Sequence, residues 1–276
     1  VAISMIGVSA IGMILFTTRP VGDAMATTIW GTSSSWTLTA LPLFVWMGEI
    51  LFRTKLSENL FKGLAPWMQK LPGGLIHVNV VGCALFAAIS GSSAATVATV
   101  GKMSIPELRK RKYPEKILLG SLAGSGTLGL LIPPSIILII YGVTVQESIA
   151  KLFIAGIIPG IMIALIFMSY VIIWSLINKK NMPKANETYS FFEKIKRSKQ
   201  LLPVILLILG VIGSIYSGVA TATEAASLGV VGALILSYFQ KSLNAKNFKN
   251  SLLGATKTSC MIAFILAGST FLSLAM

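Results

Sequence analysis

The segment that decides the fold is an apolar stretch interrupted at its centre by small polar residues. Residues 71–101 read LPGGLIHVNVVGCALFAAISGSSAATVATVG, with Ser90-Gly91-Ser92-Ser93 in the interior. Two complete crossings of a bilayer would need roughly 40 apolar residues, and this segment is shorter than that. We therefore predict a re-entrant hairpin, which enters the membrane, turns near its middle at residues 90–93 and returns to the side it came from.

The distribution of positive charge supports this hairpin. Lys and Arg concentrate in four segments between apolar runs, at 53–70, 102–116, 179–200 and 241–257. Little charge falls in the other connections, at 17–40, 147–150 and 217–223. Membrane proteins keep Lys and Arg on the cytoplasmic side. If residues 71–101 re-enter, all four basic segments fall on that side, whereas one full crossing would place the later ones on the wrong side.

The composition is that of an integral membrane protein. Apolar residues make up 54% of the chain and charged residues 12%, and the mean hydropathy is +0.81. Long apolar runs without a dominant alternating pattern predict an all-α polytopic protein rather than a β-barrel. The net charge of +14 lies almost entirely in the basic segments. That placement favours orientation in the membrane and contact with anionic headgroups over nucleic-acid binding.

The usual markers of catalysis and metal binding are weak in this sequence. Cys83 and Cys260 both lie in apolar runs, so we expect two buried thiols rather than a disulfide. His77 is the sole histidine, which gives a transition-metal site no support. The sequence has no Ser/His/Asp or Cys/His set, and its carboxylates fall at different depths. We therefore predict no enzymatic activity and no cofactor.

A second irregular element is expected downstream, in the apolar run 117–146. Residues 124–135 read GSGTLGLLIPPS. Proline lacks a backbone N–H and clashes with the carbonyl four residues earlier, so the helix should break just before Pro133. A helix broken at mid-membrane offers half-helix ends, whose N-termini favour anions and whose free carbonyls favour sodium. A proline kink with glycines for close packing is the alternative, but the nearby Ser/Gly turn favours a site.

The Ser/Gly turn offers oxygen ligands without a carboxylate, which suits a monovalent cation better than calcium or magnesium. We expect residues 90–93 to form this site. Thr96 and Thr99 are expected instead to bond back to carbonyls of their own helix, as Ser and Thr commonly do.

The few acidic residues are predicted to have structural roles. Glu224 follows Thr221 by three residues, a capping-box spacing that we favour over ion coupling. The same spacing relates Glu147 to Thr144 and Glu107 to Ser104. Glu49 precedes Arg53 by four residues, which predicts an ion pair on one helix face. Asp23 is expected to be exposed.

Several motifs, taken together, resemble the large membrane subunit of tripartite ATP-independent periplasmic (TRAP) transporters. They are LPLFVWMGEIL at 41–51, FAAISGSSAATVATVGKMSIPEL at 86–108, GTLGLLIPPS at 126–135 and LFIAGIIPGI at 152–161. A later segment, GVATATEAASLGVV at 218–231, is similar to that family's Thr-Glu-Ala-Ala region. Ala222 stands where the family pattern has proline between the two threonines, a departure that touches only a turn.

This resemblance implies an ion-transporter-superfamily elevator fold with two inverted repeats, each with a re-entrant hairpin and a broken helix. It implies a sodium-driven importer of an organic anion: a C4-dicarboxylate, a keto acid, or sialic acid or another sugar acid, which we favour although no residue indicates it. Carried over by position, the sodium ligands are Ser90, Gly91, Ser92, Ser93, Gly126, Thr127, Ile132 and Pro133. The substrate-binding residues are Ser92, Ser93, Pro134 and Ser135.

The resemblance also implies partners and a location. The expected partners are a small membrane subunit, a periplasmic substrate-binding protein, the organic anion and the lipid bilayer of the bacterial inner membrane. Because the chain begins and ends inside apolar runs, we expect a fragment truncated at both ends, with one complete sodium site and half of the substrate site.

The expected organisation has four parts. They are scaffold helices at 1–70, transport elements at 71–146 (hairpin 71–101 and broken helix 117–146), a connecting helix and basic cytoplasmic linker at 147–200, and the incomplete second repeat at 201–276. Three alternatives remain: a stand-alone sodium–dicarboxylate symporter of related fold, a non-catalytic membrane scaffold, and a membrane-embedded enzyme, which would need a His or carboxylate pair at one depth.

Overall fold

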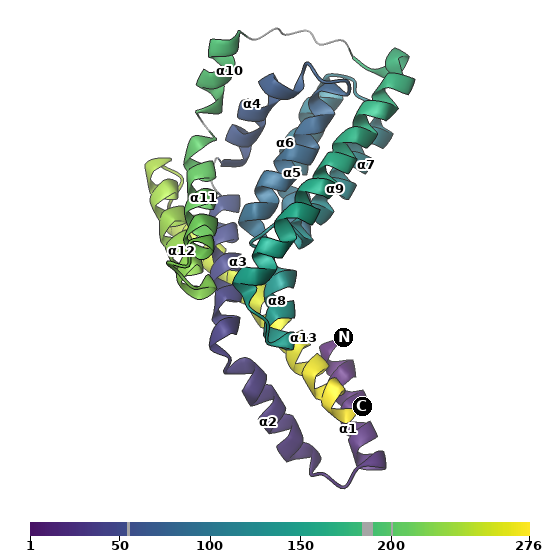
Figure 1. Ribbon diagram of the computed structural model, residues 1–276, viewed down its shortest axis with the longest axis vertical. Coiled ribbons are helices and arrows are strands. Elements are labelled where there is room, and N and C mark those ends of the chain that lie inside the picture. The colour runs from purple at the N-terminus through teal and green to yellow at the C-terminus, as the bar shows by residue number, and fades with distance from the viewer. Residues whose placement is uncertain (54–55, 184–189, 200) are drawn as a thin grey trace.

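The computed structural model describes residues 1–276 except 54–55, 184–189 and 200, and the secondary structure of the described part is helical throughout (Figure 1). The α-helices are α1 (Ala2–Phe16), α2 (Val21–Ser33), α3 (Ala40–Phe52), α4 (Leu56–Met68), α5 (His77–Ser90), α6 (Ser93–Lys110), α7 (Glu115–Gly126), α8 (Ile136–Val145), α9 (Ile149–Ile177), α10 (Phe191–Ser198), α11 (Leu202–Tyr216), α12 (Ala222–Phe239) and α13 (Ala245–Ala275). Four 3₁₀ turns join them, η1 (Trp36–Thr39), η2 (Gly74–Ile76), η3 (Thr127–Leu130) and η4 (Lys179–Asn181). The predicted all-α class is confirmed.

Several helices have the length and composition of membrane spans. Among the described residues, α9, α12 and α13 are each long and apolar enough to cross a bilayer. The count rises to five if two bent pairs each form one span: α2 with η1 and α3, bent by 56°, and α10 with α11, bent by 59°. α1, α8 and the η2–α5 segment are apolar but shorter. The chain therefore has the elements of a polytopic membrane protein.

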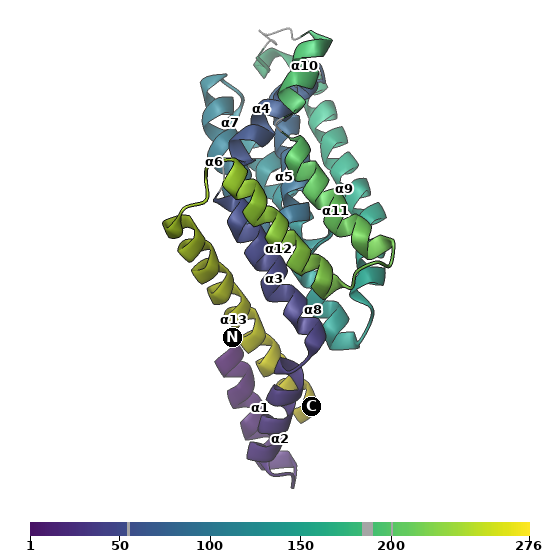
Figure 2. The same ribbon diagram turned by 90° about the vertical axis from the view of Figure 1, so that its left-hand side faces the viewer.

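The helices form an elongated bundle around α3. α5, α6, α7 and α9 lie together in the upper part of Figures 1 and 2, while α1, α2 and the end of α13 form the narrow lower part, where both termini lie. α3 packs against α12, α13 and α5. Its Phe44 meets Phe153 of α9 edge to face, with ring centroids 6.0 Å apart, so the core joins segments distant in sequence.

The predicted hairpin is present as the antiparallel pair α5 and α6. Gly91, between the two helices, has a left-handed backbone (φ 57°), and Ser92 is the N-cap of α6. At the opposite end, the Leu75 backbone N–H donates to the Tyr113 hydroxyl over 3.1 Å, so the bases of the two arms lie side by side. The second arm continues to Lys110, nine residues beyond the predicted end at residue 101. Its membrane depth stays a prediction.

The basic segments are more helical than their charge suggests. The segment 53–70 contains α4, 179–200 contains α10, and most of 241–257 belongs to α13. Residues 54–55, 184–189 and 200 of these segments lie outside the described residues. Charge alone predicts exposure, not loop structure, since charged side chains also stabilise an exposed helix face. At the end of α6, for example, Nε of the C-cap Arg111 donates to Glu107 Oε1 at 2.9 Å, one helical turn away.

The predictions for the acidic residues are confirmed in three of five cases, the first being Asp23, which is exposed. Thr221 and Glu224 form the expected capping box at the start of α12, and Arg53 pairs with Glu49 at 2.9 Å. The other two predicted boxes are wrong. Ser104 and Glu107 lie inside α6, and Ser148 rather than Thr144 caps α9. A three-residue spacing identifies a cap only where a helix begins, and α6 begins eleven residues before Ser104.

The two cysteines lie in different surroundings. Cys83 is buried in α5, whereas Cys260 in α13 is exposed, and both thiols are free. The prediction of no disulfide is confirmed, but the prediction that both are buried holds for Cys83 alone.

Candidate ion and substrate site at the hairpin tip

The tip of the hairpin depends on a glycine. At Gly91 a side chain would be strained by the positive φ, and a Cβ there would lie 2.8 Å from the Pro134 carbonyl oxygen. Ser90 ends α5 and is buried, and the Ser92 side chain accepts from Ala95 N–H over 3.4 Å to cap α6. The Ser-Gly-Ser sequence therefore ends one helix and starts the next within two residues.

The predicted helix break lies opposite this tip. α7 ends at Gly126, η3 covers Thr127–Leu130, and α8 starts at Ile136, so the chain leaves the α-helix seven residues before Pro133. Pro133 and Pro134 are buried, and the buried Ser135 hydroxyl donates to the Leu130 carbonyl over 2.6 Å. The hydroxyl bridges the non-helical segment and holds its two ends together.

The tip and the break are in direct contact. Ile136 N–H lies 3.5 Å from the Gly91 carbonyl oxygen. A Cβ on Gly129 would lie 3.0 Å from Ser93 N, and one on Gly126 would clash with Val97 of α6. The predicted juxtaposition of residues 90–93 with the proline break is therefore present in the fold. The glycines allow the two backbones to approach this closely.

α3 also contacts the hairpin tip, and the sequence did not predict this contact. A Cβ on Gly48 would lie 2.9 Å from Ser90 Cα, so α3 touches the tip backbone directly. Gly48 lies within LPLFVWMGEIL, one of the motifs that carry the family resemblance. A glycine inside an apolar helix was the available signal, because it indicates close approach of another backbone.

The tip hydroxyls are not equivalent. Ser90 Oγ and Thr96 Oγ1 are 2.9 Å apart, and Thr96 also donates to the Ser92 carbonyl over 2.8 Å, as predicted. The prediction for Thr99 is wrong, because its buried hydroxyl has no partner. Ser93 Oγ is likewise buried and unpartnered. An unpaired buried hydroxyl is costly unless something binds it, so Ser93 is the strongest ligand candidate at the tip.

Three residues predicted at the break direct their side chains elsewhere. Thr127 is exposed, and its hydroxyl donates to the Gly124 carbonyl over 2.6 Å. Ile132 and Pro133 contact the surface of α9 next to Gly160 and Gly156. Any contribution of Ile132 and Pro133 to an ion site must therefore come from backbone oxygens.

The helix ends give the contact its electrostatic character. The N-termini of α6 and α8 and the C-termini of α5 and η3 meet where Gly91 touches Ile136 and Gly129 touches Ser93. Helix N-termini carry partial positive charge and C-termini partial negative charge. No group of three or more His, Cys, Asp or Glu residues gathers in the described part of the chain. The polar groups at this contact are neutral oxygens and helix dipoles.

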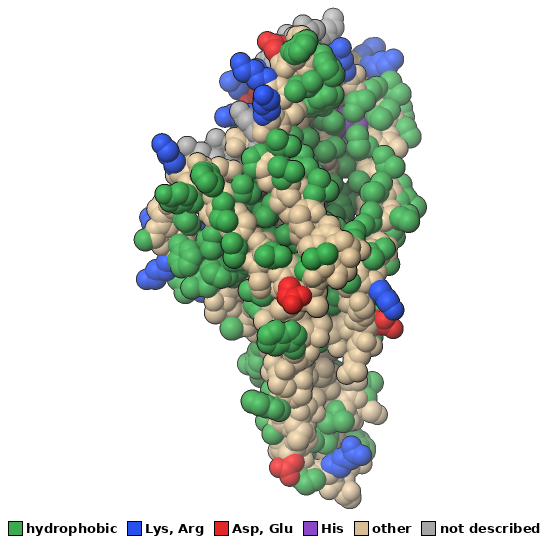
Figure 3. Space-filling model, turned by 60° about the vertical axis from the view of Figure 1, so that its left-hand side comes forward, with side chains coloured by type: hydrophobic (Ala, Val, Ile, Leu, Met, Phe, Trp, Pro, Cys, Tyr) green, Lys and Arg blue, Asp and Glu red, His purple; other side chains and the backbone are tan. Residues whose placement is uncertain are grey.

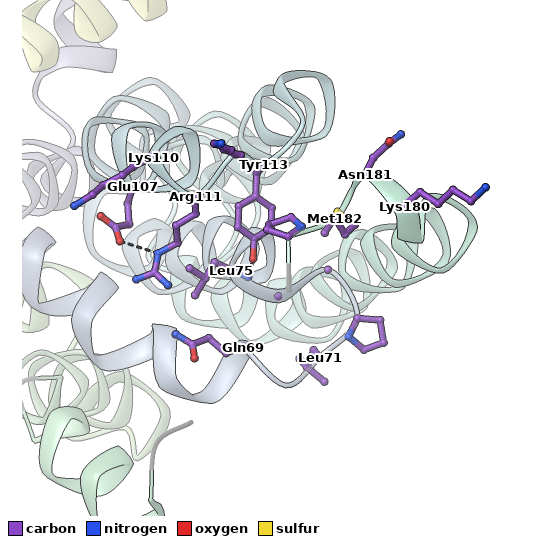
Figure 4. Close-up of a pocket in the computed structure, with 15 residues that line it drawn as sticks. Gln69, Leu71, Leu75, Glu107, Lys110, Arg111, Tyr113, Lys180, Asn181 and Met182 are labelled. Atoms are coloured by element: carbon purple, nitrogen blue, oxygen red, sulfur yellow. Dashed lines mark hydrogen bonds and ion pairs between the residues drawn. The ribbon is translucent and has the colours of Figure 1, made fainter. Parts of the chain in front are cut away.

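A large cavity lies at the other end of the hairpin. It has a volume of about 840 Å³ and is lined by residues of the segment 69–75, which precedes α5, by the end of α6 with residues 111–113, and by residues 180–183 (Figure 4). Tyr113 stands at its centre, beside the ion pair of Arg111 with Glu107. Burial raises the pKa of the Tyr113 phenol above its ordinary value. This cavity belongs to the base of the hairpin and not to the tip.

Comparison with known proteins identifies the family. The family model described as "Tripartite ATP-independent periplasmic transporter, DctM component" matches residues 1–276. The chain belongs to this family. The resemblance inferred from the sequence motifs is therefore confirmed over the whole chain.

Relatives in the DctM family are named for different substrates. The chain is 34% identical to the C4-dicarboxylate TRAP transporter large permease protein DctM of Pseudomonas aeruginosa, over 94% of this chain and 60% of that protein. It is 34% identical to the sialic acid TRAP transporter large permease protein SiaM of Vibrio cholerae, over 87% of this chain and 56% of that protein. It is 36% identical to the ectoine/5-hydroxyectoine TRAP transporter large permease protein UehC of Ruegeria pomeroyi, over 72% of this chain and 46% of that protein. The chain thus spans less than two thirds of the length of each of these relatives.

Proposed function

We propose that this chain is part of the permease subunit of a TRAP transporter that imports an organic anion together with sodium across the bacterial inner membrane. The observation that carries this proposal is the contact between the hairpin tip and the broken helix. It joins four helix ends and the buried, unpartnered Ser93 hydroxyl. Membership of the DctM family supports the same function.

Sodium is the cation that these groups suit. Helix C-termini and serine hydroxyls provide neutral oxygen ligands, which bind a monovalent ion without the carboxylates that calcium needs. The proposed ligand set is residues 90–93 with Gly126, Thr127, Ile132 and Pro133. Ser93 contributes its hydroxyl, while Ile132 and Pro133 contribute backbone oxygens.

The organic anion is proposed to bind beside the sodium ion. Two helix N-termini, at Ser92–Ser93 and at Pro134–Ser135, point partial positive charge toward a carboxylate. These residues form one half of the substrate site, and the other half belongs to the second repeat. The identities to dicarboxylate, sialic acid and ectoine transporters are nearly equal, so the overall similarity does not select the substrate.

Transport is proposed to follow an elevator mechanism. α5, α6 and α7 pack on one another, so the hairpin and the first half of the broken helix can move as a unit. The proposed partners are a small membrane subunit and a periplasmic binding protein that delivers the anion. A relative from Oleidesulfovibrio alaskensis bears the name "permease protein DctMQ", which indicates that the two membrane components can share a chain.

Uptake by proteoliposomes tests this function. The complete permease, with its small subunit, is reconstituted and given labelled dicarboxylate, sialic acid or ectoine, each with its binding protein. We expect uptake that requires both an inward sodium gradient and the binding protein. Uptake without a binding protein would instead identify a stand-alone symporter, and binding without uptake would favour a scaffold.

A further inference from the structure

The helices α4 and α10 form an aromatic contact at the end of the molecule where the basic segments gather. Trp67 Nε1 donates to the Ser198 hydroxyl over 2.7 Å, and the rings of Trp67 and Phe191 meet edge to face at 6.3 Å. Lys194 Nζ lies 5.4 Å from the centre of the Trp67 ring. α10 is therefore held on α4 in one defined orientation, although it has only eight residues.

The side of α10 next to this contact is apolar and open, with Phe191 at the boundary between the two. Phe191, Phe192 and Ile195 have exposed fractions of 64%, 82% and 41%. At about 3.6 residues per turn these three side chains share one side of α10, with Lys194 and Lys196 at its two borders. Figure 3 shows this end of the molecule, where hydrophobic side chains lie next to Lys and Arg.

The charge around this apolar side is positive. Lys194, Lys196, Arg197 and Lys199 lie within or directly after α10. The Glu193 carboxylate is engaged at the start of the helix, where it accepts the Ser190 N–H over 3.1 Å. α10 is also bent by 59° from the apolar α11, so it does not simply extend that membrane helix. A short basic helix with an exposed apolar side is the pattern of helices that lie in the membrane interface.

We propose that α10, braced by Trp67, docks on the bilayer surface. Phe192 and Ile195 enter the boundary between headgroups and acyl chains, and Lys194 and Lys196 contact anionic phospholipid headgroups. An anionic lipid is the occupant that fits, because two cations border the apolar side and the helix connects two membrane segments. α10 is held on α4, and α4 directly precedes the hairpin. Docking of α10 on lipid therefore fixes the membrane surface from which the hairpin arms start.

The test measures how deeply α10 sits in lipid. The complete subunit carries Phe192→Cys and is labelled there with an environment-sensitive fluorophore. Cys260→Ser removes the exposed native thiol, whereas Cys83 is buried and is kept. It is placed in nanodiscs of phosphatidylcholine alone or mixed equally with phosphatidylglycerol. We expect the label to be shielded from aqueous iodide in the mixed discs and several-fold less shielded in phosphatidylcholine. A label at Arg197→Cys, on the opposite side of the helix, should stay open to iodide in both.

Removal of the bordering charges sharpens the test. One lysine near an anionic surface changes partitioning about fivefold, so Lys194→Gln with Lys196→Gln should abolish the lipid-dependent shielding at residue 192. The matched pair Lys246→Gln with Lys249→Gln, exposed in α13, should leave it unchanged. Equal shielding of residue 192 in both lipids would overturn the proposal. That is the result expected if protein, rather than lipid, covers the apolar side of α10. Equal exposure in both lipids overturns it as well.

Discussion

The tip of the α5–α6 hairpin and its base belong to one element but are stabilised by different interactions. At the tip, Gly91, Gly126 and Gly129 let backbones touch, and the polar groups are uncharged. At the base, the Tyr113 phenol accepts from the Leu75 N–H, a half-buried ion pair joins Arg111 to Glu107, and residues 180–183 line a large open cavity beside them. The tip is therefore suited to binding a small ion in a fixed geometry, and the base to anchoring the arms near water.

The largest expected effect concerns the direction of the two arms. Cysteines at Lys70 and Lys102, both exposed positions, are expected to react with an impermeant maleimide from the cytoplasmic side alone. Cys260→Ser removes the exposed native thiol from the background. Reaction of the two positions from opposite faces would mean that residues 71–101 cross the membrane, and the comparison between tip and base would fail.

At the tip, Gly91→Ala is expected to reduce sodium-driven uptake at least about tenfold, because a left-handed backbone with a Cβ is strained by roughly 1–3 kcal/mol. The added Cβ would also press on the Pro134 carbonyl. Gly120→Ala is the matched control, since a Cβ there meets nothing within 4 Å. Wild-type uptake by the Gly91 variant would show that the tip geometry is not required.

Ser93→Ala is expected to raise the sodium concentration for half-maximal uptake about tenfold, since one hydroxyl ligand contributes roughly 1–1.5 kcal/mol. Thr127→Ala should give a smaller increase, because that hydroxyl is exposed and already donates to Gly124. Thr256→Ala, which removes a comparable hydroxyl bonded within α13, serves as control. If the broken helix, rather than the tip, supplied the side-chain ligand, Thr127→Ala would raise this sodium concentration more than Ser93→Ala.

The smallest effect is expected at the base. Tyr113→Phe removes the acceptor of the Leu75 N–H and should destabilise the protein by about 1 kcal/mol, seen as a slightly lower Tm of the purified subunit. The sodium concentration for half-maximal uptake should not change. The exposed Tyr141→Phe should alter neither quantity. A loss of sodium affinity in the Tyr113 variant would show that tip and base do not act separately.

The sequence predicted the tip better than the base. Gly91, the Ser residues and Pro133-Pro134 have strong local preferences, so both irregular elements could be located, and the loop charges indicated that the first of them re-enters the membrane. The base depends on Tyr113 reaching Leu75 across 38 residues, a long-range contact that no local pattern encodes. The same limit explains Gly48, whose partner Ser90 lies in another helix.

The hydroxyl groups show a second limit. Thr96 and Thr99 have the same local sequence preferences, yet Thr96 bonds to the Ser92 carbonyl and Thr99 has no partner. Similarly, Thr127 looked like Ser93 as a potential ligand, but its side chain is exposed. Which hydroxyl faces an internal contact depends on the rotation of each helix against its neighbours, and that is set by packing over the whole bundle.

The most direct test of the central claim, that the contact between tip and broken helix is an ion site, is equilibrium binding of radioactive sodium to the purified complete subunit. We predict saturable binding that unlabelled sodium displaces and potassium does not, weakened about tenfold by Ser93→Ala and unchanged by Gly120→Ala. Sodium binding of equal affinity in the wild-type and Ser93→Ala proteins would contradict the account.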